Sequence, residues 1–163
     1  MNMIVLGALA AMVAAPVAMS AERLTPNEFV MKASEAGTAE VELGKLAAQK
    51  AAAADVKAFG QRMVTDHSKA GAELDAIAGK KNLPTVKELN PTHKKALADL
   101  SAKSGADFDA AFAKQMVMDH NEAVALFTGA SALPDADLAG FAKKTLPTLK
   151  EHQQMASHLG MAH

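Results

Sequence analysis

The chain has 163 residues, a formal net charge of −1 and no cysteine. A chain of this length suits one domain, and the lack of cysteine excludes disulfide bonds, so the elements must be held together by packing alone. Lysine and arginine residues are scattered rather than gathered in a stripe, and aromatic residues make up only 4% of the chain. This pattern argues against nucleic acid as a partner.

Residues 1–20 have the pattern of a secretory signal peptide. The run Ile4–Ala15 is apolar, and the small residues Ala18 and Ser20 stand at the −3 and −1 positions of a cleavage site. No lysine or arginine precedes the run, which departs from the usual pattern. The alternative is an uncleaved membrane anchor, which needs roughly 20 apolar residues, whereas this run is short and is followed by Pro16. We therefore expect cleavage near Ser20, a periplasmic or otherwise exported protein, and no membrane span after cleavage.

The first helix has a clear start signal. Thr25 is an N-cap residue, Pro26 suits the first helical position, and Glu28, three residues after the cap, completes a capping box. Small and apolar residues then recur at spacings of four and three, so they share one helix face. The same periodicity predicts three more long helices, and Pro147 should kink the last of them. The predicted ranges are 26–51, 55–81, 106–131 and 135–160.

The connection formed by residues 82–105 differs from the two short turns. It contains Pro84 and a predicted short helix at 91–103 that begins at Asn90-Pro91. Short turns make the first two and the last two long helices into antiparallel hairpins, whereas this longer connection can cross the bundle from end to end. Two hairpins joined by one long crossover are the ferritin-like arrangement of a four-helix bundle. The predicted fold class is therefore all-α, with one such bundle over residues 21–163.

An acidic residue followed by histidine occurs three times inside the predicted helices. FGQRMVTDHSKA, residues 59–70, returns as FAKQMVMDHNEA, residues 112–123, and Glu151-His152 forms the third pair. An end-to-end crossover makes the second and third long helices parallel, so the two Asp-His pairs lie at one level. Glu40 reaches this level from the first helix, and His152 lies about three residues past it, roughly 4–5 Å along the helix axis. The sequence thus predicts one polar layer at mid-bundle, formed by Glu40, Asp66, His67, Asp119, His120 and His152.

This polar layer suits a metal ion. Histidine nitrogens and carboxylates from facing helices are ligands of divalent transition metals, and bundle cores are where such sites are built. Asp66 and Asp119 could serve as ligands or as hydrogen-bond partners of the ligands. The usual di-iron site uses Glu-x-x-His on two helices, but Val64, Val117 and Leu149 stand three residues before the histidines here. We therefore do not expect an iron oxidase or an iron-storage protein, and we lean against an enzyme.

Methionine adds a copper variant of this hypothesis. Met63 and Met116 each lie four residues before a histidine, and Met155 lies three residues after one, so each pair shares a helix face. Thioether together with imidazole suits Cu(I), although methionine on an inward stripe usually fills gaps in a core. The expected cofactor is thus a divalent transition metal or copper.

The alternative to a metal is a buried hydrogen-bond network, in which each histidine donates to an acidic residue on a neighbouring helix and fixes the register. The protein would then be a non-catalytic structural or stress-protection protein of the envelope. Alanine-rich stretches at 47–48 and 51–54 permit close helix approach and suggest self-association. His93 on the connection and His158 near the C-terminus are expected to be exposed to solvent.

Four runs of the sequence carry a resemblance to a known family. FVMKASEAGTAEVELGKLAAQKA, VKAFGQRMVTDHSKA, FAKQMVMDHNEAVALF and LPTLKEHQQMA resemble the bacterial family catalogued as domain of unknown function 4142. The likeness covers about residues 26–160. It implies an exported protein with a ferritin-like fold, and it brings no settled activity.

Overall fold

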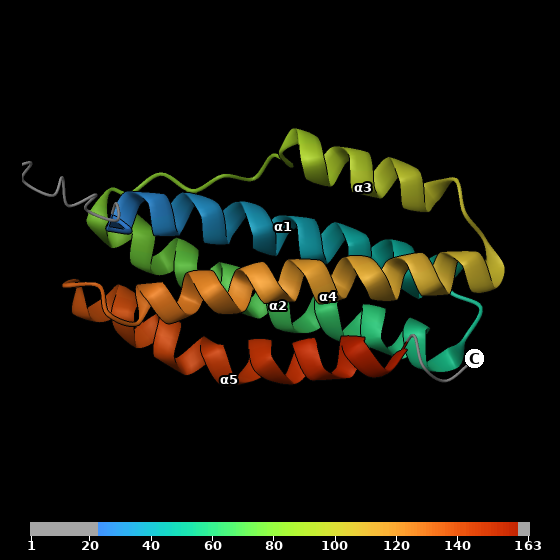
Figure 1. Cartoon of the computed structure of the whole chain (residues 1–163). Helices are drawn as coiled ribbons and strands as arrows, with labels where there is room; N and C mark the ends of the chain where they lie inside the picture. Colours follow the sequence, from blue (N-terminus) through green and yellow to red (C-terminus); the bar gives the residue numbers. More distant parts are fainter. Residues whose placement is uncertain (1–22, 160–163) are drawn as a thin grey trace, which may run out of the picture.

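The computed structural model describes residues 23–159, which fold into helices joined by turns and one long connection (Figure 1). Residues 23–159 contain no β-strand, so the predicted all-α fold is confirmed, and none of their helices is long and apolar enough to cross a membrane. The predicted signal peptide, residues 1–20, lies outside the described residues. The helices are α1 (Pro26–Lys50), α2 (Ala54–Lys81), α3 (Pro91–Ser101), α4 (Gly105–Ala130) and α5 (Ala136–Leu159).

The four long helices form a bundle of two antiparallel hairpins, α1 with α2 and α4 with α5. α1 also lies beside α4, and α2 lies beside α5. The connection from α2 to α4 runs back along the bundle and carries α3, which packs on the outside against α1 and α4. α2 and α4 therefore run in the same direction, as the long crossover predicts. This is the connection order of ferritin-like bundles, while kinship with ferritins stays a prediction.

The first two helices are capped in different ways. At the start of α1, the backbone nitrogen of Glu28 lies 3.2 Å from Thr25 Oγ1, and the Thr25 nitrogen lies 2.8 Å from Glu28 Oε2. The turn before α2 is held by a distant residue, because Asp109 of α4 accepts hydrogen bonds from the backbone nitrogens of Ala52 (3.1 Å) and Ala53 (2.8 Å). Asp109 thus ties the first hairpin to the second at one end of the bundle.

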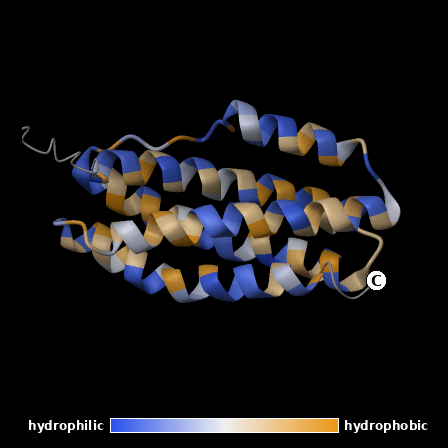
Figure 2. Cartoon of the chain, in the orientation of Figure 1, coloured by the Kyte–Doolittle hydropathy of each residue, from blue (hydrophilic) through white to orange (hydrophobic). Residues whose placement is uncertain are grey.

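Two apolar clusters fill the bundle on either side of its middle. One cluster contains Phe59 and Phe112, and the other contains Phe29 and Phe127. Hydrophobic and hydrophilic residues alternate along the helices (Figure 2), which is the pattern of amphipathic helices packed in a bundle. Along α2 and α4 the Asp-His pairs stand between residues of the first cluster and residues of the second. The predicted polar layer is therefore at the boundary between the two clusters.

α1 and α2 approach closely where two glycines face each other. A Cβ atom on Gly60 would lie 2.8 Å from the carbonyl oxygen of Gly44 and 2.8 Å from the Cβ atom of Ala47. A side chain has no room at either glycine, so the sequence uses the residue that lacks one. Ala47 and Ala48 serve this contact within the hairpin, and self-association of the protein stays a prediction.

Candidate metal centre

Three histidines from three helices meet in the middle of the bundle. One ring nitrogen from each of His67 (α2), His120 (α4) and His152 (α5) lies within 4.8 Å of those of the other two. The ring centroids are 5.6 Å apart for His67 and His120, 5.5 Å for His67 and His152, and 5.4 Å for His120 and His152. These residues are called the histidine cluster below. The parallel course of α2 and α4 brings the two repeated motifs to one level, as the sequence predicts.

Hydrogen bonds orient two of these rings. His120 Nδ1 lies 2.9 Å from the carbonyl oxygen of Met116, and His152 Nε2 lies 2.9 Å from Asp66 Oδ2. Because both partners accept hydrogen bonds, each of these ring nitrogens carries the proton and donates. The other nitrogen of each ring, Nε2 of His120 and Nδ1 of His152, then keeps a free lone pair.

Each ring of the histidine cluster also has a buried nitrogen without a hydrogen-bond partner among the described residues. Nε2 of His67, Nε2 of His120 and Nδ1 of His152 are buried, and none has a hydrogen-bond partner among the described residues. His120 and His152 are fully buried, whereas His67 keeps some exposure as a residue although its Nε2 is buried. Such buried polar atoms are rare in proteins and call for an explanation.

The histidine cluster is neutral at physiological pH. Burial lowers the pKa of His67 to about 3, helped by the neighbouring His120 and His152. Burial also lowers the pKa of His120 to about 4, and it lowers the pKa of His152. Neutral imidazole is the form that binds metals, so the cluster needs no deprotonation before it can do so.

Glu40 lies next to the histidine cluster but does not join it. Its side chain is buried, its Oε1 lies 3.8 Å from His120 Nδ1, and its Oε2 has no hydrogen-bond partner among the described residues. Burial, and then the nearby negative charge of Asp119, raise the pKa of Glu40 well above its usual value. Burial therefore favours the neutral form of this carboxyl group.

Asp66 supports the cluster from outside. Besides accepting from His152, its Oδ2 lies 3.2 Å from Arg62 Nε, and Arg62 Nη2 lies 2.9 Å from Glu151 Oε2. Burial alone would raise the pKa of Asp66, but the hydrogen bonds from His152 and Arg62 outweigh it and lower the pKa. Asp66 is thus an ionised carboxylate that holds His152 in place.

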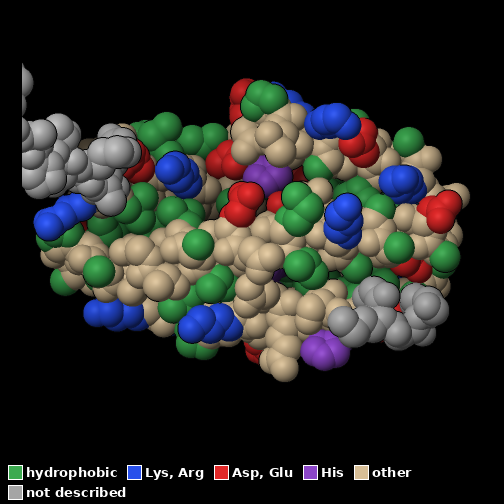
Figure 3. Space-filling model, in the orientation of Figure 1, with side chains coloured by type: hydrophobic (Ala, Val, Ile, Leu, Met, Phe, Trp, Pro, Cys, Tyr) green, Lys and Arg blue, Asp and Glu red, His purple; other side chains and the backbone are tan. Residues whose placement is uncertain are grey.

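Asp119 turns away from the histidine cluster and toward α3. Its carboxylate accepts hydrogen bonds from Gln115 Nε2 at 2.8 and 3.0 Å, and it lies 3.7 Å from His93 Nε2. His93 Nδ1 in turn lies 2.8 Å from Glu35 Oε1. Figure 3 shows this face, with a histidine between acidic side chains where α3 covers the bundle.

The expectation that His93 is exposed is wrong. Only 12% of its side chain is accessible, because the crossover places it between the carboxylates of Glu35 and Asp119. These carboxylates, Asp119 first, outweigh burial and raise the pKa of His93 to about 9. Periodicity could not reveal this contact, since it joins the crossover to two helices far away in sequence. His158, by contrast, is exposed as expected.

The methionines give the copper variant little support. Met63 and Met116 are buried in the apolar cluster around Phe59, and Met116 meets His120 through its backbone carbonyl. Met155 Sδ lies 3.1 Å from Arg62 Nη1 and accepts from that guanidinium group. The sulfur of Met155 is therefore engaged on the outer side of the Asp66 network.

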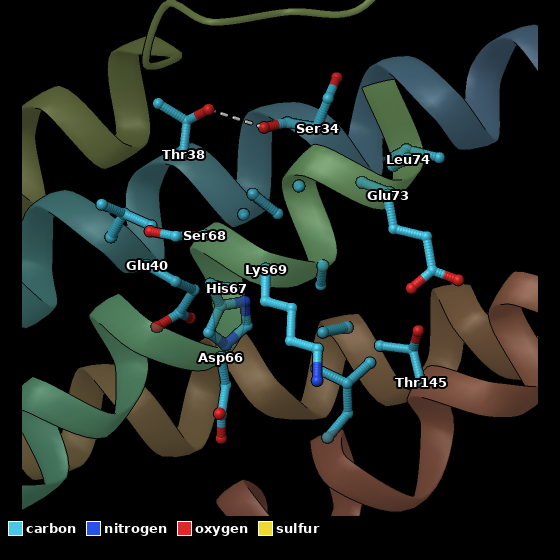
Figure 4. Close-up of a pocket in the computed structure, with 18 of the residues that line it drawn as sticks. Ser34, Thr38, Glu40, Asp66, His67, Ser68, Lys69, Glu73, Leu74 and Thr145 are labelled. Atoms are coloured by element: carbon cyan, nitrogen blue, oxygen red, sulfur yellow. Dashed lines mark hydrogen bonds between the residues drawn. The ribbon is translucent and has the colours of Figure 1, made fainter. Parts of the chain in front are cut away.

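A cavity of about 470 Å³ borders the histidine cluster and is lined by residues of all four long helices. Figure 4 shows part of this lining, with Glu40 from α1 and His67 from α2 among the residues drawn. His67 and His152 both border the cavity. The cavity and the histidine cluster are therefore neighbours.

Comparisons with known proteins establish the family but no activity. No curated protein matches the chain. Among solved structures it is similar to the crystal structure of a DUF305 fragment from Deinococcus radiodurans, with a TM-score of 0.73 and 17% identity over 85% of this chain and 99% of that one. At this identity the likeness shows the fold alone. The model of the family described as "Domain of unknown function (DUF4142)" matches residues 9–159. The chain therefore belongs to the DUF4142 family, in agreement with the resemblance seen in its sequence.

Proposed function

We propose that this protein binds one transition-metal ion through ring nitrogens of His67, His120 and His152. The proposal rests on three histidines that each offer a ring nitrogen within 4.8 Å of the others, and that each have a buried ring nitrogen without a hydrogen-bond partner among the described residues. A buried polar group left unpaired costs about 1–3 kcal/mol, so one ligand that pairs with all three nitrogens would stabilise the site. A metal ion is a ligand that accepts three lone pairs at once.

The hydrogen bonds around the cluster favour a metal over a purely structural network. Histidines that ligate metals almost always donate their other ring nitrogen to a carboxylate or a carbonyl group. His152 does so to Asp66, and His120 does so to the carbonyl of Met116. A structural network would instead pair the inward nitrogens with acidic residues. The network alternative requires each histidine to donate to an acidic residue. His152 donates to Asp66, but the nearest oxygen of Glu40 lies 3.8 Å from His120 Nδ1, which is too far for a hydrogen bond.

The donor set suits zinc, copper or nickel, because neutral imidazole is a ligand that these ions share. In a tetrahedral zinc site, metal–nitrogen bonds of about 2.1 Å place the nitrogens about 3.4 Å apart. The ring nitrogens here lie within 4.8 Å of one another, so each pair needs to approach by at most about 1.4 Å when an ion binds. Three protein ligands also leave one coordination position open, as in metal sites that exchange water or small molecules.

We further propose that the protein works outside the cytoplasm, in the periplasm or beyond. The apolar run and the cleavage pattern within residues 1–20 support this. N-terminal sequencing of the protein from its own cells tests the proposal, with Ala21 expected as the first residue. A cytoplasmic protein that keeps residues 1–20 would contradict it.

Metal analysis of the untagged protein purified from its own envelope tests the metal site. We expect near-stoichiometric zinc, copper or nickel in the wild type and its loss in His152→Ala. The matched control is His158→Ala, because His158 lies on the same helix, is exposed, and contacts the carbonyl oxygen of Gln154 within its own turn. The control should keep its metal.

A different result would identify the cluster as architecture. Metal well below stoichiometry in the wild type, and no thermal shift when zinc, copper or nickel is added, would overturn the proposal. His152→Ala should then act mainly on stability, because it removes a hydrogen-bond donor from the partly buried Asp66 carboxylate. The protein would be a non-catalytic bundle that works through its outer surface.

A further inference from the structure

The cavity beside the histidine cluster has a polar end and an apolar inner wall. Glu40, His67 and His152 form the polar end. Its volume of about 470 Å³ falls within the range of about 300–1,000 Å³ that is usual for small-molecule sites. The inner wall consists of buried apolar side chains, namely Leu74, Phe127, Phe141 and Leu149.

Two glycines leave this cavity open. Gly37 in α1 and Gly71 in α2 line it, and a Cβ atom built on either meets no other atom within 4 Å. Glycine inside a helix costs about 0.5–1 kcal/mol relative to alanine. At Gly44 and Gly60 the close contact between α1 and α2 explains why glycine is present despite this cost, because a Cβ atom would not fit. No such contact exists at Gly37 and Gly71, where the missing side chain leaves space.

The polar end of the cavity suits an anionic oxygen donor. An ion held by three neutral imidazoles keeps its positive charge, and two of these histidines, His67 and His152, line the cavity. Beside it, Glu40 is 5% exposed and its Oε2 has no partner among the described residues. One oxygen of a carboxylate head can bind the ion, and the head then lies beside Glu40.

Most of the charged side chains that line the cavity are paired. Lys87 pairs with Asp75, while Asp66 and Asp119 face Arg62 and His93. Lys69 lines the cavity and forms no ion pair among the described residues, whereas Lys144 is paired with Glu73 at 2.8 Å. Figure 4 shows Lys69 and Glu73 among the residues around the cavity. Lys69 is therefore an uncompensated positive charge beside the entrance.

We propose that the cavity binds a small organic carboxylate with an apolar body. The head occupies the open position of the metal ion next to Glu40, and the body lies along Leu74, Phe127 and Phe141. This inference rests on the proposed metal site and assigns the ligand class of that site. Neither an inorganic anion nor an uncharged apolar molecule matches both ends of the cavity.

Titration of the cobalt-loaded full-length protein with sodium hexanoate tests the ligand class, because the visible absorption of Co²⁺ reports a change in coordination. We expect a saturable spectral change, with an affinity at least tenfold higher than that of acetate, since each buried methylene group adds to binding. 1-Hexanol has the apolar body without the head and should leave the spectrum unchanged. Equal affinities for acetate and hexanoate would overturn the proposal, because the ligand would then contact the ion alone.

Two glycine variants test the location. Gly71→Leu places a side chain in the cavity and should weaken hexanoate binding at least tenfold. Gly79→Leu is the matched control, because Gly79 lies on the same helix, also faces open space and does not line the cavity. Both variants should load cobalt like the wild type. Hexanoate binding that is unchanged in Gly71→Leu would overturn the proposed location.

The cobalt loading separates this inference from the proposed function. A wild-type protein that takes up no cobalt refutes the metal site itself. A protein that loads cobalt normally and shows no response to hexanoate refutes the carboxylate site and leaves the metal site standing.

Discussion

His152 of α5 and Asp66 of α2 meet at 2.9 Å between Nε2 and Oδ2, although 86 residues separate them in sequence. The carboxylate holds the proton on Nε2, so Nδ1 of the same ring keeps its lone pair toward the other two histidines. Asp66 is in turn held by Arg62. The pair therefore sets both the tautomer and the direction of one proposed metal ligand.

Replacing Asp66 should weaken metal binding without removing a ligand. We expect Asp66→Ala to lower the affinity for Zn²⁺ about 10- to 100-fold, which is the usual effect of losing such a supporting residue. Asp66→Asn should fall between this variant and the wild type, because its amide oxygen still accepts the hydrogen bond but carries no charge. Competition against a chelator measures the affinity, and far-ultraviolet circular dichroism checks the fold. Equal affinity in all three proteins would rule out the supporting role.

His93 should make the stability of the bundle depend on pH. Its pKa rises from an ordinary value of 6.5 to about 9 in the folded protein, because it lies between Asp119 and Glu35. Because protonated His93 is more stable in the folded protein than in the unfolded chain, it adds to the free energy of unfolding. This contribution is complete below about pH 6.5 and is lost as the pH rises through 9. After allowance for solvent screening at this partly exposed site, we expect a contribution of about 1–2 kcal/mol.

The His93→Gln variant isolates this contribution. Chemical unfolding of both proteins at pH 6 and at pH 10 should show a wild-type advantage at pH 6 that disappears at pH 10. Because all other groups are shared, the difference between the two proteins reports His93. A wild-type advantage that grows with pH would contradict the assignment.

The two kinds of helical glycine should respond oppositely to alanine. At Gly60 a Cβ atom would lie 2.8 Å from the carbonyl oxygen of Gly44, so Gly60→Ala forces α1 and α2 apart. We expect a loss of about 1–3 kcal/mol, the usual cost of overpacking. Gly71→Ala meets no atom and should raise stability by about 0.5–1 kcal/mol through helix propensity. Thermal unfolding of the two variants tests this prediction. Equal midpoints would contradict it, because they would show that α1 and α2 can move apart at little cost in stability.

Asp109 should matter for stability although it lies far from the histidine cluster. It is buried and accepts the backbone N–H groups of Ala52 and Ala53. Asp109→Ala leaves both groups without a partner, and we expect a loss of about 2–6 kcal/mol, from about 1–3 kcal/mol for each group. Asp109→Asn keeps one acceptor oxygen and should lose less. Denaturant unfolding measures both, and an unaffected alanine variant would mean that water replaces the carboxylate.

The sequence predicted those features that depend on periodicity and on the length of connections. The repeated motifs and the long crossover together placed His67 and His120 at one level, because parallel helices keep equal positions side by side. Helical spacing could not decide which member of each Asp-His pair turns inward, since the apolar stripe passes between them. The structure turns the histidines inward and leaves Asp66 and Asp119 at the edge of the core.

The rest of the site depends on contacts between segments that are far apart in sequence. Asp119 points toward His93, which the crossover places over α4, and no local sequence pattern predicts that contact. Asp109 likewise finds its partners 56 and 57 residues away. Side-chain and main-chain pairs of this kind follow from the packing of whole helices. They become visible only when the helices are placed together.

The histidine cluster draws on both hairpins, with His67 on the first and His120 and His152 on the second. An ion bound there would cross-link the two hairpins and so close a long loop of the chain. Cross-links that close long loops remove the most conformational entropy from the unfolded chain. Unfolding of the bundle would separate the three ligands and release the ion. The bound ion would therefore stabilise the paired arrangement of the two hairpins.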